Sequence, residues 1–397
     1  MKIKSIRELK NLKGQRVLLR VDFNVPISKD GQIDKSEDYK IVQTLPTIKY
    51  LIKKGAKIII LTHLGRPDGR VVEKLRLDPV AVRLSQLLNK GVYKNDNIVE
   101  TGQAPSLRKQ INELKNGDIL MLENIRFDRR EEAGNKNFAK ELANLGDIYI
   151  NDAFGVCHRD QASVSIIQNY LPSYAGLLLE SELKNLSAVI NKPLKPLTVI
   201  IGGAKISTKI KLIQKFLKIA NHVLLGGALA NTVLHVMGVS VGKSLVEPKM
   251  YPIIKKIKLT DNQLQVPLDG VMAKSYQAKV GRLDALADVR ADELILDIGP
   301  DTIKLYEKII KSSKMIIWNG PMGLIETPFF AQGTKSLVRL LAKSKAKTIV
   351  GGGESVEIIR QLGLDKKFSF ISTGGGAMLA FLEGKKLPGL KKIATIK

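Results

Sequence analysis

The amino-acid sequence predicts an α/β protein built from two doubly wound parallel sheets, each in its own domain. Apolar runs rich in β-branched residues alternate with helical patterns along the chain, and such alternation is typical of βαβ units. The chain has 397 residues, whereas one domain takes roughly 100–200 residues, so two or three domains are expected. A break in the alternation near residue 171 divides the chain into two series.

The first series covers residues 1–170. A helical pattern follows the first strand, with Ile48, Leu51 and Ile52 on one face and Gly55 as its stop. The expected strands are 16–25, 56–62, 118–125 and 147–154, and the expected helices are 39–54, 79–88 and a charged helix before the last strand. Alternation of this kind places helices on both faces of a parallel sheet.

Residues 171–192 are predicted to form a hinge and a long interdomain helix. Pro193 and Pro196 end this helix, because proline cannot continue it. A second series then occupies residues 193–384. Its expected strands are 197–203, 222–227, 264–273, 294–299, 315–320, 347–353 and 368–373. The two series are therefore predicted to be Rossmann-like domains joined by the hinge and the long helix.

Composition limits the kind of protein. Hydrophobic residues make up 44% of the chain, enough for a sizeable core, and the single cysteine, Cys157, excludes an internal disulfide. The sequence has no run of about 18 apolar residues, and its N-terminus lacks the apolar stretch of a signal peptide. We therefore expect a cytoplasmic protein with no membrane partner.

The formal charge of +26 needs an interpretation, because a basic surface can bind nucleic acid. The lysines are spread along the chain, and aromatic residues make up only 5%, which leaves little for base stacking. We expect no specific nucleic-acid partner. A solvated lysine-rich surface is the favoured interpretation, and attraction of small polyanionic substrates is the second.

Two glycine triplets lie within residues 347–378, at positions 351–353 and 374–376. Each follows an apolar strand pattern and precedes residues that can begin a helix. Glycines let the backbone approach a ligand closely, and the next helix presents free N–H groups to it. If the two strands are neighbours in a parallel sheet, the triplets stand side by side and form a cradle for phosphate.

Polar residues follow the other predicted strands, at the edge where open parallel sheets bind ligands. The first half carries side chains suited to a small anion, namely Asp22, Asn24, His63, Arg66, Arg126, His158 and Arg159. The second half carries glycines, Lys205 and Asn319, which suit a nucleotide. We interpret the pair as half-sites for transfer between two ligands, with domain closure to exclude water.

Three other patterns are not interpreted as functional. Residues 238–244 resemble a P-loop but have three residues between the glycines, where the motif has four. Residues 158–160 resemble the catalytic loop of protein kinases, but Ser165 stands where that motif has asparagine. Cys157 and His158 are adjacent, so their side chains point apart and do not form a nucleophile pair.

Seven segments together resemble one known family. They are residues 20–26 (RVDFNVP), 63–67 (HLGRP), 122–127 (LENIRF), 151–155 (NDAFG) with His158 and Arg159, 202–205 (GGAK), 318–323 (WNGPMG) and 372–376 (STGGG). In this order, and on to residues 384–389, they resemble phosphoglycerate kinase over nearly the whole chain. The resemblance also implies that residues from about 385 to 397 return to the first domain.

The resemblance implies reversible phosphoryl transfer between ATP and the carboxylate of 3-phosphoglycerate, a step of glycolysis. The products are 1,3-bisphosphoglycerate and ADP, and Mg²⁺ accompanies the nucleotide. Residues 1–170 would bind the phosphoglycerate and residues 193–384 the nucleotide, in a monomer. Because a carboxylate is ionised at pH 7, this reaction needs no general base, and positioning and charge neutralisation remain for the protein.

Individual roles follow from the same resemblance. Asp22 and Asn24 are expected to hold the hydroxyl and carboxylate region of the glycerate. The expected ligands of its 3-phosphate are His63, Arg66, Arg126 and Arg159. The groups expected to contact the transferring phosphoryl group are Lys40, Lys205, Gly375 and Gly376. The expected nucleotide ligands are Lys205, Lys209, Gly227, Asn319, Glu326, Gly353, Glu354 and Ser355, with Glu354 also binding Mg²⁺.

Three positions depart from the usual pattern of the family. Lys40 stands where an arginine is usual, and lysine lacks the planar fork that holds a phosphoryl group at two points. Glu354 stands where an aspartate is usual, and Thr208 replaces an acid found in many members. Two hypotheses follow: an active phosphoglycerate kinase, or a catalytically weak member that acts as a nucleotide- or polyanion-binding protein.

Overall fold

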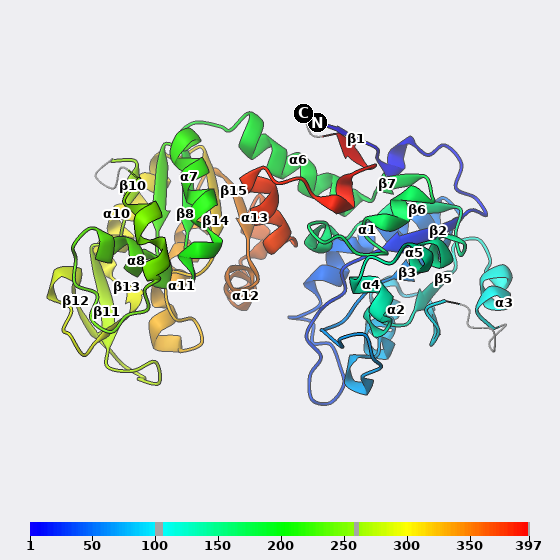
Figure 1. Cartoon of the computed structure of the whole chain (residues 1–397), viewed down its shortest axis with the longest axis horizontal. Coiled ribbons are helices and arrows are strands. Elements are labelled where there is room, and N and C mark those ends of the chain that lie inside the picture. Colours follow the sequence, from blue (N-terminus) through cyan, green and yellow to red (C-terminus); the bar gives the residue numbers. More distant parts are fainter. Residues whose placement is uncertain (100–105, 258–261, 396–397) are drawn as a thin grey trace. The chain divides into compact units, whose positions relative to one another are not determined.

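The computed structural model describes residues 1–99, 106–257 and 262–395. The chain divides into two compact units (Figure 1). The first unit comprises Met1–Ser187 together with Gly384–Lys397, and the second comprises Ala188–Glu383. The chain therefore passes from one unit to the other twice, once within a helix and once after Glu383.

The first unit is built around a six-stranded sheet in which all strands are parallel. In spatial order the strands are β4 (Tyr93–Asn95), β5 (Ile119–Leu122), β3 (Lys57–Leu61), β2 (Arg16–Arg20), β6 (Ile148–Asn151) and β7 (Ser173–Ala175). Parallel strands need crossover connections, and helices supply them here. These helices are α1 (Tyr39–Lys53), α2 (Asp78–Leu88), α3 (Ser106–Glu113), α4 (Arg129–Glu132) and α5 (Lys136–Ala143), whereas α6 (Leu177–Asn191) follows the last strand, β7.

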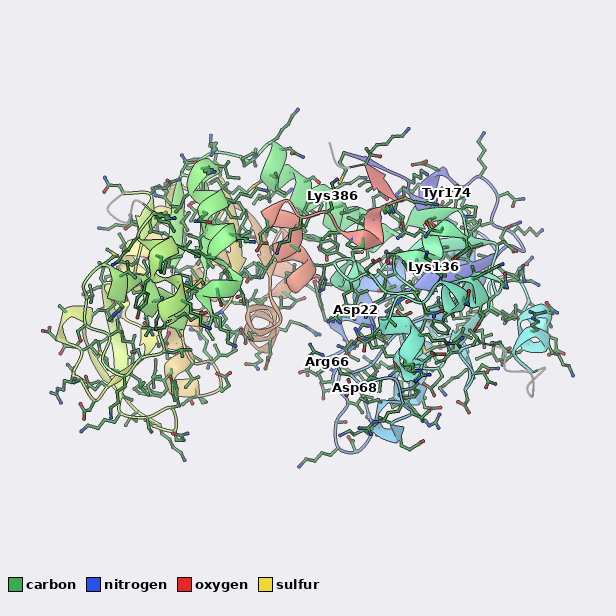
Figure 2. The ribbon with its side chains drawn as sticks, in the orientation of Figure 1. Asp22, Arg66, Asp68, Lys136, Tyr174 and Lys386 are labelled. Carbon is green, nitrogen blue, oxygen red and sulfur yellow. The ribbon has the colours of Figure 1, made fainter. Side chains whose placement is uncertain are left out.

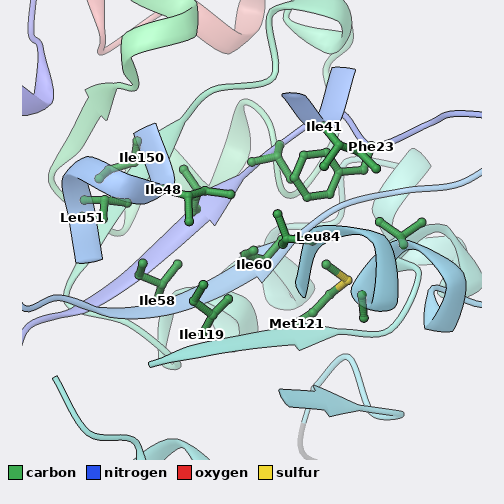
Figure 3. Packing of buried hydrophobic residues seen from close by; sticks show 14 of the residues in the cluster. Phe23, Ile41, Ile48, Leu51, Ile58, Ile60, Leu84, Ile119, Met121 and Ile150 are labelled. Carbon is green, nitrogen blue, oxygen red and sulfur yellow. The ribbon is translucent and has the colours of Figure 1, made fainter. Parts of the chain in front are cut away.

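The core of this unit lies between one face of the sheet and the helices α1 and α2 (Figure 3). Successive side chains of a strand point to opposite faces, so Ile58 and Ile60 of β3 reach the same side. The other side chains labelled there come from β5, β6, the two helices and the segment after β2: Phe23, Ile41, Ile48, Leu51, Leu84, Ile119, Met121 and Ile150. Their packing fixes the helix that begins at Tyr39 against the sheet.

The end of the chain completes the first unit. Strand β17 (Ala394–Thr395) pairs antiparallel with β1 (Lys2–Ile3). Gly389 donates its N–H to the carbonyl of Cys157 at 2.9 Å, and its own carbonyl accepts from Asn151 at 3.1 Å and Gln168 at 2.8 Å. A Cβ on Gly389 would come within 2.9 Å of the Cys157 backbone, so this close approach requires glycine.

The second unit has its own six-stranded parallel sheet. In spatial order its strands are β10 (Leu264–Gln265), β9 (His222–Leu225), β8 (Leu197–Ile201), β14 (Met315–Asn319), β15 (Lys347–Gly351) and β16 (Phe370–Ile371). The helices of this unit are α7 (Ile210–Ile219), α8 (Ala228–Val236), α9 (Tyr251–Ile254), α10 (Pro300–Ser312), α11 (Gln332–Lys343), α12 (Gly353–Gln361) and α13 (Gly376–Glu383). The predicted adjacency of the two glycine-ended strands is confirmed, since β15 pairs with β16 in parallel.

Two sequence predictions in the second unit are wrong. The single strand predicted over 264–273 is two strands, because Pro267 cannot donate to a ladder and interrupts the run. Its second part belongs to a separate three-stranded antiparallel sheet, with β11 (Asp269–Ala273) between β12 (Arg282–Ala285) and β13 (Leu294–Ile298). The strand predicted at 294–299 therefore lies outside the parallel sheet.

The other predicted elements are present with small changes of length. The first strand ends at Arg20 rather than at Val25, and α6 begins at Leu177, within the segment 171–192 predicted to hold the hinge and the long helix. The charged helix predicted before β6 is two short helices, α4 and α5, which Gly134 separates with a φ of 62°. Within the described ranges, no helix combines the length and the apolar character needed to cross a membrane.

Candidate active site

The predicted anion-binding residues of the first unit follow the carboxyl ends of its parallel strands. Asp22 and Asn24 follow β2, His63 and Arg66 follow β3, and Arg126 follows β5. Arg159 lies in the segment after β6. Because the strands are parallel, these segments lie on one edge of the sheet, where Figure 2 shows Asp22 and Arg66.

Asp22 and Lys40 form an ion pair, with 3.1 Å between Oδ2 of Asp22 and Nζ of Lys40. Lys40 lies in the first turn of α1, which packs beside β2 and carries the ammonium to the strand end. Burial raises the pKa of Asp22, but the charge of Lys40, joined by that of His63 once its ring is protonated at low pH, outweighs burial and lowers the pKa to about 2. At neutral pH the ring of His63 is uncharged, so the Lys40 charge maintains the Asp22 carboxylate.

His63 is buried, with 3% of its surface exposed. Burial lowers its pKa well below the usual value, the carboxylate of Asp22 opposes this effect, and the charges of Arg20, Arg126 and Lys40 add to the lowering. Its Nδ1 atom lies 3.4 Å from Nη2 of Arg20. His63 is therefore a neutral side chain inside a cluster of cations, suited to hydrogen bonding rather than to proton transfer at pH 7.

Arg126 is almost fully buried, yet part of its guanidinium group has no hydrogen bond. Its Nη1 atom donates to the carbonyl of Gly65 at 2.8 Å, whereas Nε and Nη2 have no hydrogen-bond partner among the described residues. Glu132 lies 3.3 Å from Nε, but not in the geometry of a hydrogen bond. Burial lowers the pKa of Arg126 to about 10, and the residue remains a cation at pH 7.

Buried donors without partners are rare, so those of Arg126 indicate a place for an acceptor that the described residues do not supply. Arg159 repeats the pattern: its Nε is buried without a hydrogen bond to any described residue, and its Nη1 lies 3.8 Å from Glu132. A phosphate group has enough oxygen acceptors to satisfy both guanidinium groups. The arrangement can therefore bind a small dianion.

Asn24 and Arg66 flank these groups and are exposed. Asn24 accepts a hydrogen bond of 2.8 Å from the N–H of Gly65, which joins the segments after β2 and β3. The carbonyl of the same Gly65 accepts a hydrogen bond from Arg126. The segments that carry Asn24, Arg66 and Arg126 therefore meet at this turn. Gly65 has a φ of 64°, a conformation that other residues rarely adopt.

In the second unit, a lysine lies beside two strand ends. Nζ of Lys209 donates to the carbonyl of Gly202 at 2.6 Å, after β8, and lies 3.4 Å from the carbonyl of Asn319, at the end of β14. Burial lowers the pKa of Lys209 to about 8, and the charge of Glu354 partly opposes the shift. Lys205 precedes it in the same segment and is exposed.

The two glycine triplets follow β15 and β16. Gly352 has a φ of 102°, and a Cβ on it would lie 3.1 Å from the side-chain nitrogen of Asn319. By contrast, a Cβ on Gly353 or on Gly375 would meet no atom within 4 Å. These two glycines therefore border open space at the beginnings of α12 and α13, where Gly353 and Gly376 are the first helical residues.

Asn319 and Ser355 hold the backbone of this edge in place. The side-chain amide of Asn319 donates to the carbonyl of Gly351 at 2.9 Å, and the hydroxyl of Ser355 accepts from the N–H of Gly320 at 3.0 Å. Both side chains are buried. They therefore connect β14 with the first triplet through hydrogen bonds to backbone groups.

A cavity of about 240 Å³ opens beside these residues. Apolar side chains such as Leu234, Tyr276 and Met322 make up part of its wall. The predicted nucleotide ligands that line it are Gly227, Glu326 and Glu354. An apolar wall with a few polar groups at one end suits a flat organic ring with a charged substituent.

Glu354 is the predicted Mg²⁺ ligand. Among the residues that the structure describes, no group of three or more His, Cys, Asp or Glu side chains is arranged to hold a metal ion. Mg²⁺ in phosphoryl-transfer sites binds through one or two carboxylates together with phosphate oxygens and water. One exposed carboxylate at the first turn of α12 fits that chemistry, provided that a nucleotide supplies the other ligands.

The sequence interpretation missed the residues that surround the anion-binding groups. Glu132, which approaches both Arg126 and Arg159, lies in the charged helix whose contacts were not predicted. Arg20 was recognised only as part of a motif, although a cation inside the apolar run of β2 signals a buried polar contact. Its partners Ser163 and Glu131 come from distant segments, and no local signal identifies them.

Comparison with known proteins gives a consistent result. A model of the family described as phosphoglycerate kinase matches residues 6–385. A phosphoglycerate kinase of Roseiflexus sp. (strain RS-1) is 44% identical over 392 residues, covering 98% of both chains. One from Dictyoglomus turgidum is 45% identical over 398 residues, again with 98% coverage of both.

Solved structures show the same relationship. The structure of phosphoglycerate kinase from Coxiella burnetii superposes with a TM-score of 0.84 at 37% identity, and that from Pyrococcus horikoshii with 0.85 at 32%. Each match covers 98% of this chain and 98% of the other. A family model that matches residues 6–385, together with relatives of this identity and coverage, shows that the chain belongs to the phosphoglycerate kinase family.

Proposed function

We propose that the first unit binds 3-phosphoglycerate, that the second binds ATP, and that the phosphoryl group passes between them. As a member of its family the chain is an enzyme, a phosphotransferase with a carboxyl group as acceptor. The observation that carries the assignment of the first unit is the buried guanidinium of Arg126, whose Nε and Nη2 have no hydrogen-bond partner among the described residues. A substrate phosphate would complete both.

The predicted anion-binding residues would each contact a particular part of the substrate. Arg126 and Arg159 would bind the 3-phosphate through their free N–H groups, with His63 as a neutral donor and Arg66 from the exposed side. Asp22 and Asn24 would hold the hydroxyl and carboxylate region of the glycerate. The ionised Asp22 can accept a hydrogen bond from the substrate hydroxyl at any pH well above 2.

The second unit would bind the nucleotide along the cavity. The apolar wall near Gly227 would take the base and Glu326 the ribose hydroxyls. Lys209, Asn319 and Ser355 would lie beside the phosphates. The backbone N–H groups that begin α12 at Gly353, and those that begin α13 at Gly376, would face phosphate oxygens, because helix N-termini favour negative charge.

Mg²⁺ would be held by Glu354 together with the nucleotide, and it would supply positive charge to the phosphate groups. The transfer itself needs little covalent chemistry from the protein. Lys40, Lys205 and the amides of Gly375 and Gly376 would neutralise the charge that spreads over the transferring group. We expect the two units to close around both substrates during the reaction, which would exclude water as a competing acceptor.

A coupled assay tests this proposal directly. ATP consumption in the presence of 3-phosphoglycerate and Mg²⁺ should greatly exceed consumption without the acceptor. The alternative, a catalytically weak nucleotide- or polyanion-binding member, draws no support from the comparisons. It would be established by ATP binding in calorimetry combined with no turnover above background, and that result would overturn the proposal.

A further inference from the structure

Arg20 is the largest charged side chain in the interior of the first unit, with 0% of its surface exposed. It lies at the end of β2, two residues before Asp22. Its Nη1 donates to the carbonyl of Val21, and its Nη2 lies 3.4 Å from Nδ1 of His63. It is therefore in contact with the proposed substrate site without being open to the substrate.

The other side of the guanidinium is anchored. Nε of Arg20 donates to the hydroxyl of Ser163 at 2.9 Å. That hydroxyl donates to Oε1 of Glu131 at 2.6 Å, and the backbone N–H of Ser163 donates to Oε2 at 2.9 Å. Glu131 is fully buried; burial raises its pKa, and the charge of Arg20 opposes this shift. Ser163 thus joins a buried cation to a buried carboxyl group.

The contact with His63 restricts which ring nitrogen can carry hydrogen. A guanidinium group has only donors and stays protonated in proteins. Nδ1 of His63 must therefore accept, so it carries a lone pair. A neutral imidazole with a lone pair on Nδ1 carries its proton on Nε2. The contact with Arg20 uses Nδ1 and leaves Nε2 as the donor of the ring.

The charged groups around His63 disfavour protonation of its ring, with the exception of Asp22. Arg20 at the end of β2, Lys40 on α1 and Arg126 after β5 all oppose a positive charge on the ring, whereas Asp22 favours one. Asp22 is itself paired with Lys40 at 3.1 Å, which reduces its effect on the ring. Protonating Nδ1 would also turn its contact with Arg20 into two donors facing each other.

We propose that Arg20, held by Ser163 and Glu131, is a positioning residue that keeps His63 as the neutral tautomer protonated on Nε2. The inference rests on the proposed function for its consequence: His63 then presents an N–H donor to the substrate phosphate at neutral pH. Without Arg20 the ring would exchange between tautomers, and the one protonated on Nδ1 would turn a lone pair towards the phosphate oxygens.

Nuclear magnetic resonance on the unmodified enzyme tests the tautomer itself. The chain has only four histidines, so spectra of protein labelled with ¹⁵N-histidine contain few signals, and His63→Gln identifies the one that matters. We expect an unprotonated Nδ1 and a protonated Nε2 that do not change between pH 6 and pH 8. A proton on Nδ1, or titration of the ring within that range, would overturn the proposal.

Variants test the role of Arg20. In Arg20→Met with Glu131→Gln, which leaves no buried charge unpaired, His63 should show mixed tautomers and a pKa nearer to its usual value. Affinity for 3-phosphoglycerate at pH 8 should fall by about three- to tenfold relative to the parent, the size of one lost hydrogen bond. This difference in affinity between variant and parent should become smaller towards pH 6, because His63 in the variant is then protonated and its imidazolium donates from both nitrogens. A deficit that does not change with pH would show a structural role only.

Milder variants cover the case in which the double variant does not fold. Ser163→Ala removes the group that anchors Arg20, and Ser165→Ala is its matched control, since Ser165 bonds to Asp160 and Gln161 instead. Only the first should mix the tautomers of His63; mixing in both, or in neither, contradicts the proposal. The tautomer is measured without substrate. If His63 has the expected tautomer but its signals do not change when 3-phosphoglycerate is added, the proposed function of the site is rejected, whereas the role of Arg20 in fixing the tautomer is not.

Discussion

Lys40 and Asp22 form an ion pair of 3.1 Å, which joins the cation proposed to stabilise the transferring phosphoryl group to the carboxylate proposed to hold the substrate. Both side chains are largely protected from solvent, with 30% and 10% exposed. Lys40 lies in the first turn of α1, and Asp22 lies in the segment that follows β2. Binding of substrate at Asp22 would therefore change the surroundings of the catalytic cation directly.

Lys40→Arg should raise kcat, because a guanidinium can hold a phosphoryl group at two points and an ammonium cannot. Lys40→Met should lower kcat by about 100-fold, in line with the loss of one group that stabilises a transition state. Steady-state kinetics measure both. Lys49→Met is a suitable control, since it removes the same charge from an exposed position of the same helix. An unchanged or lower kcat in Lys40→Arg would mean that this position does not serve the transition state.

Arg126→Met should raise the KM for 3-phosphoglycerate by about 10- to 100-fold, because it removes charge-assisted hydrogen bonds to the phosphate. The KM for ATP should stay close to that of the parent. Arg290→Met removes one exposed positive charge from the other unit and controls for the change in net charge. Equal effects of Arg126→Met on both substrates would indicate damage to the fold and would count against a phosphate site at this arginine.

Gly353→Ala should leave the free energy of unfolding within about 0.5 kcal/mol of the parent, because its Cβ meets no atom and its φ is not positive. The KM for ATP should nevertheless rise, since the new methyl group would occupy the space proposed for phosphate. Gly91→Ala, also without neighbours around a Cβ, is the matched control in the other unit. If Gly353→Ala binds ATP as well as Gly91→Ala does, the first triplet does not contact the nucleotide.

Asp152 should make the first unit less stable as the pH rises from about 4 to about 7. Burial raises the pKa of Asp152 to about 7, and hydrogen bonds from Thr47 and from the N–H groups of Leu178 and Leu179 only partly oppose this. The folded state therefore binds more protons than the unfolded state between the two pKa values, and stability falls as the pH increases through that window.

Asp152→Asn removes this titration while keeping an oxygen for the N–H of Leu179, which lies 3.0 Å from Oδ1. The unfolding free energy of the variant relative to the parent should rise by about 1–3 kcal/mol between pH 5 and pH 8. Urea unfolding at several pH values measures the difference. A difference that stays constant over this range would show that Asp152 is ionised throughout. Asp297, whose pKa burial also raises to about 7, would still titrate in both proteins.

Local sequence patterns were sufficient to predict most strands of the two parallel sheets. A strand such as β15 is an uninterrupted apolar run that ends in glycine, so both its position and its ligand-binding end can be recognised. The same applies to β3, whose end carries His63. Residues such as Asp22 and His63 closely follow such strands, which is why local patterns identified them.

Features that depend on pairing could not be predicted in this way. A buried apolar run looks the same in a parallel or an antiparallel sheet, so β13 was assigned to the wrong one. The bond between Arg20 and Ser163 joins residues 143 positions apart, and neither residue signals the other. Likewise, the pairing of Lys40 with Asp22 depends on how α1 packs against β2 rather than on any property of the two residues.

The position of residues 384–395 against the first unit has a consequence for how the protein is made. The second unit is one continuous stretch, Ala188–Glu383, whereas the first needs Gly389 for its contacts with Cys157 and Gln168, and β17 for its contact with β1. During translation, the unit synthesised second has all its residues before the unit synthesised first does. Messages truncated shortly before codon 384 should therefore give chains whose first unit lacks the contacts that Gly389 and β17 supply.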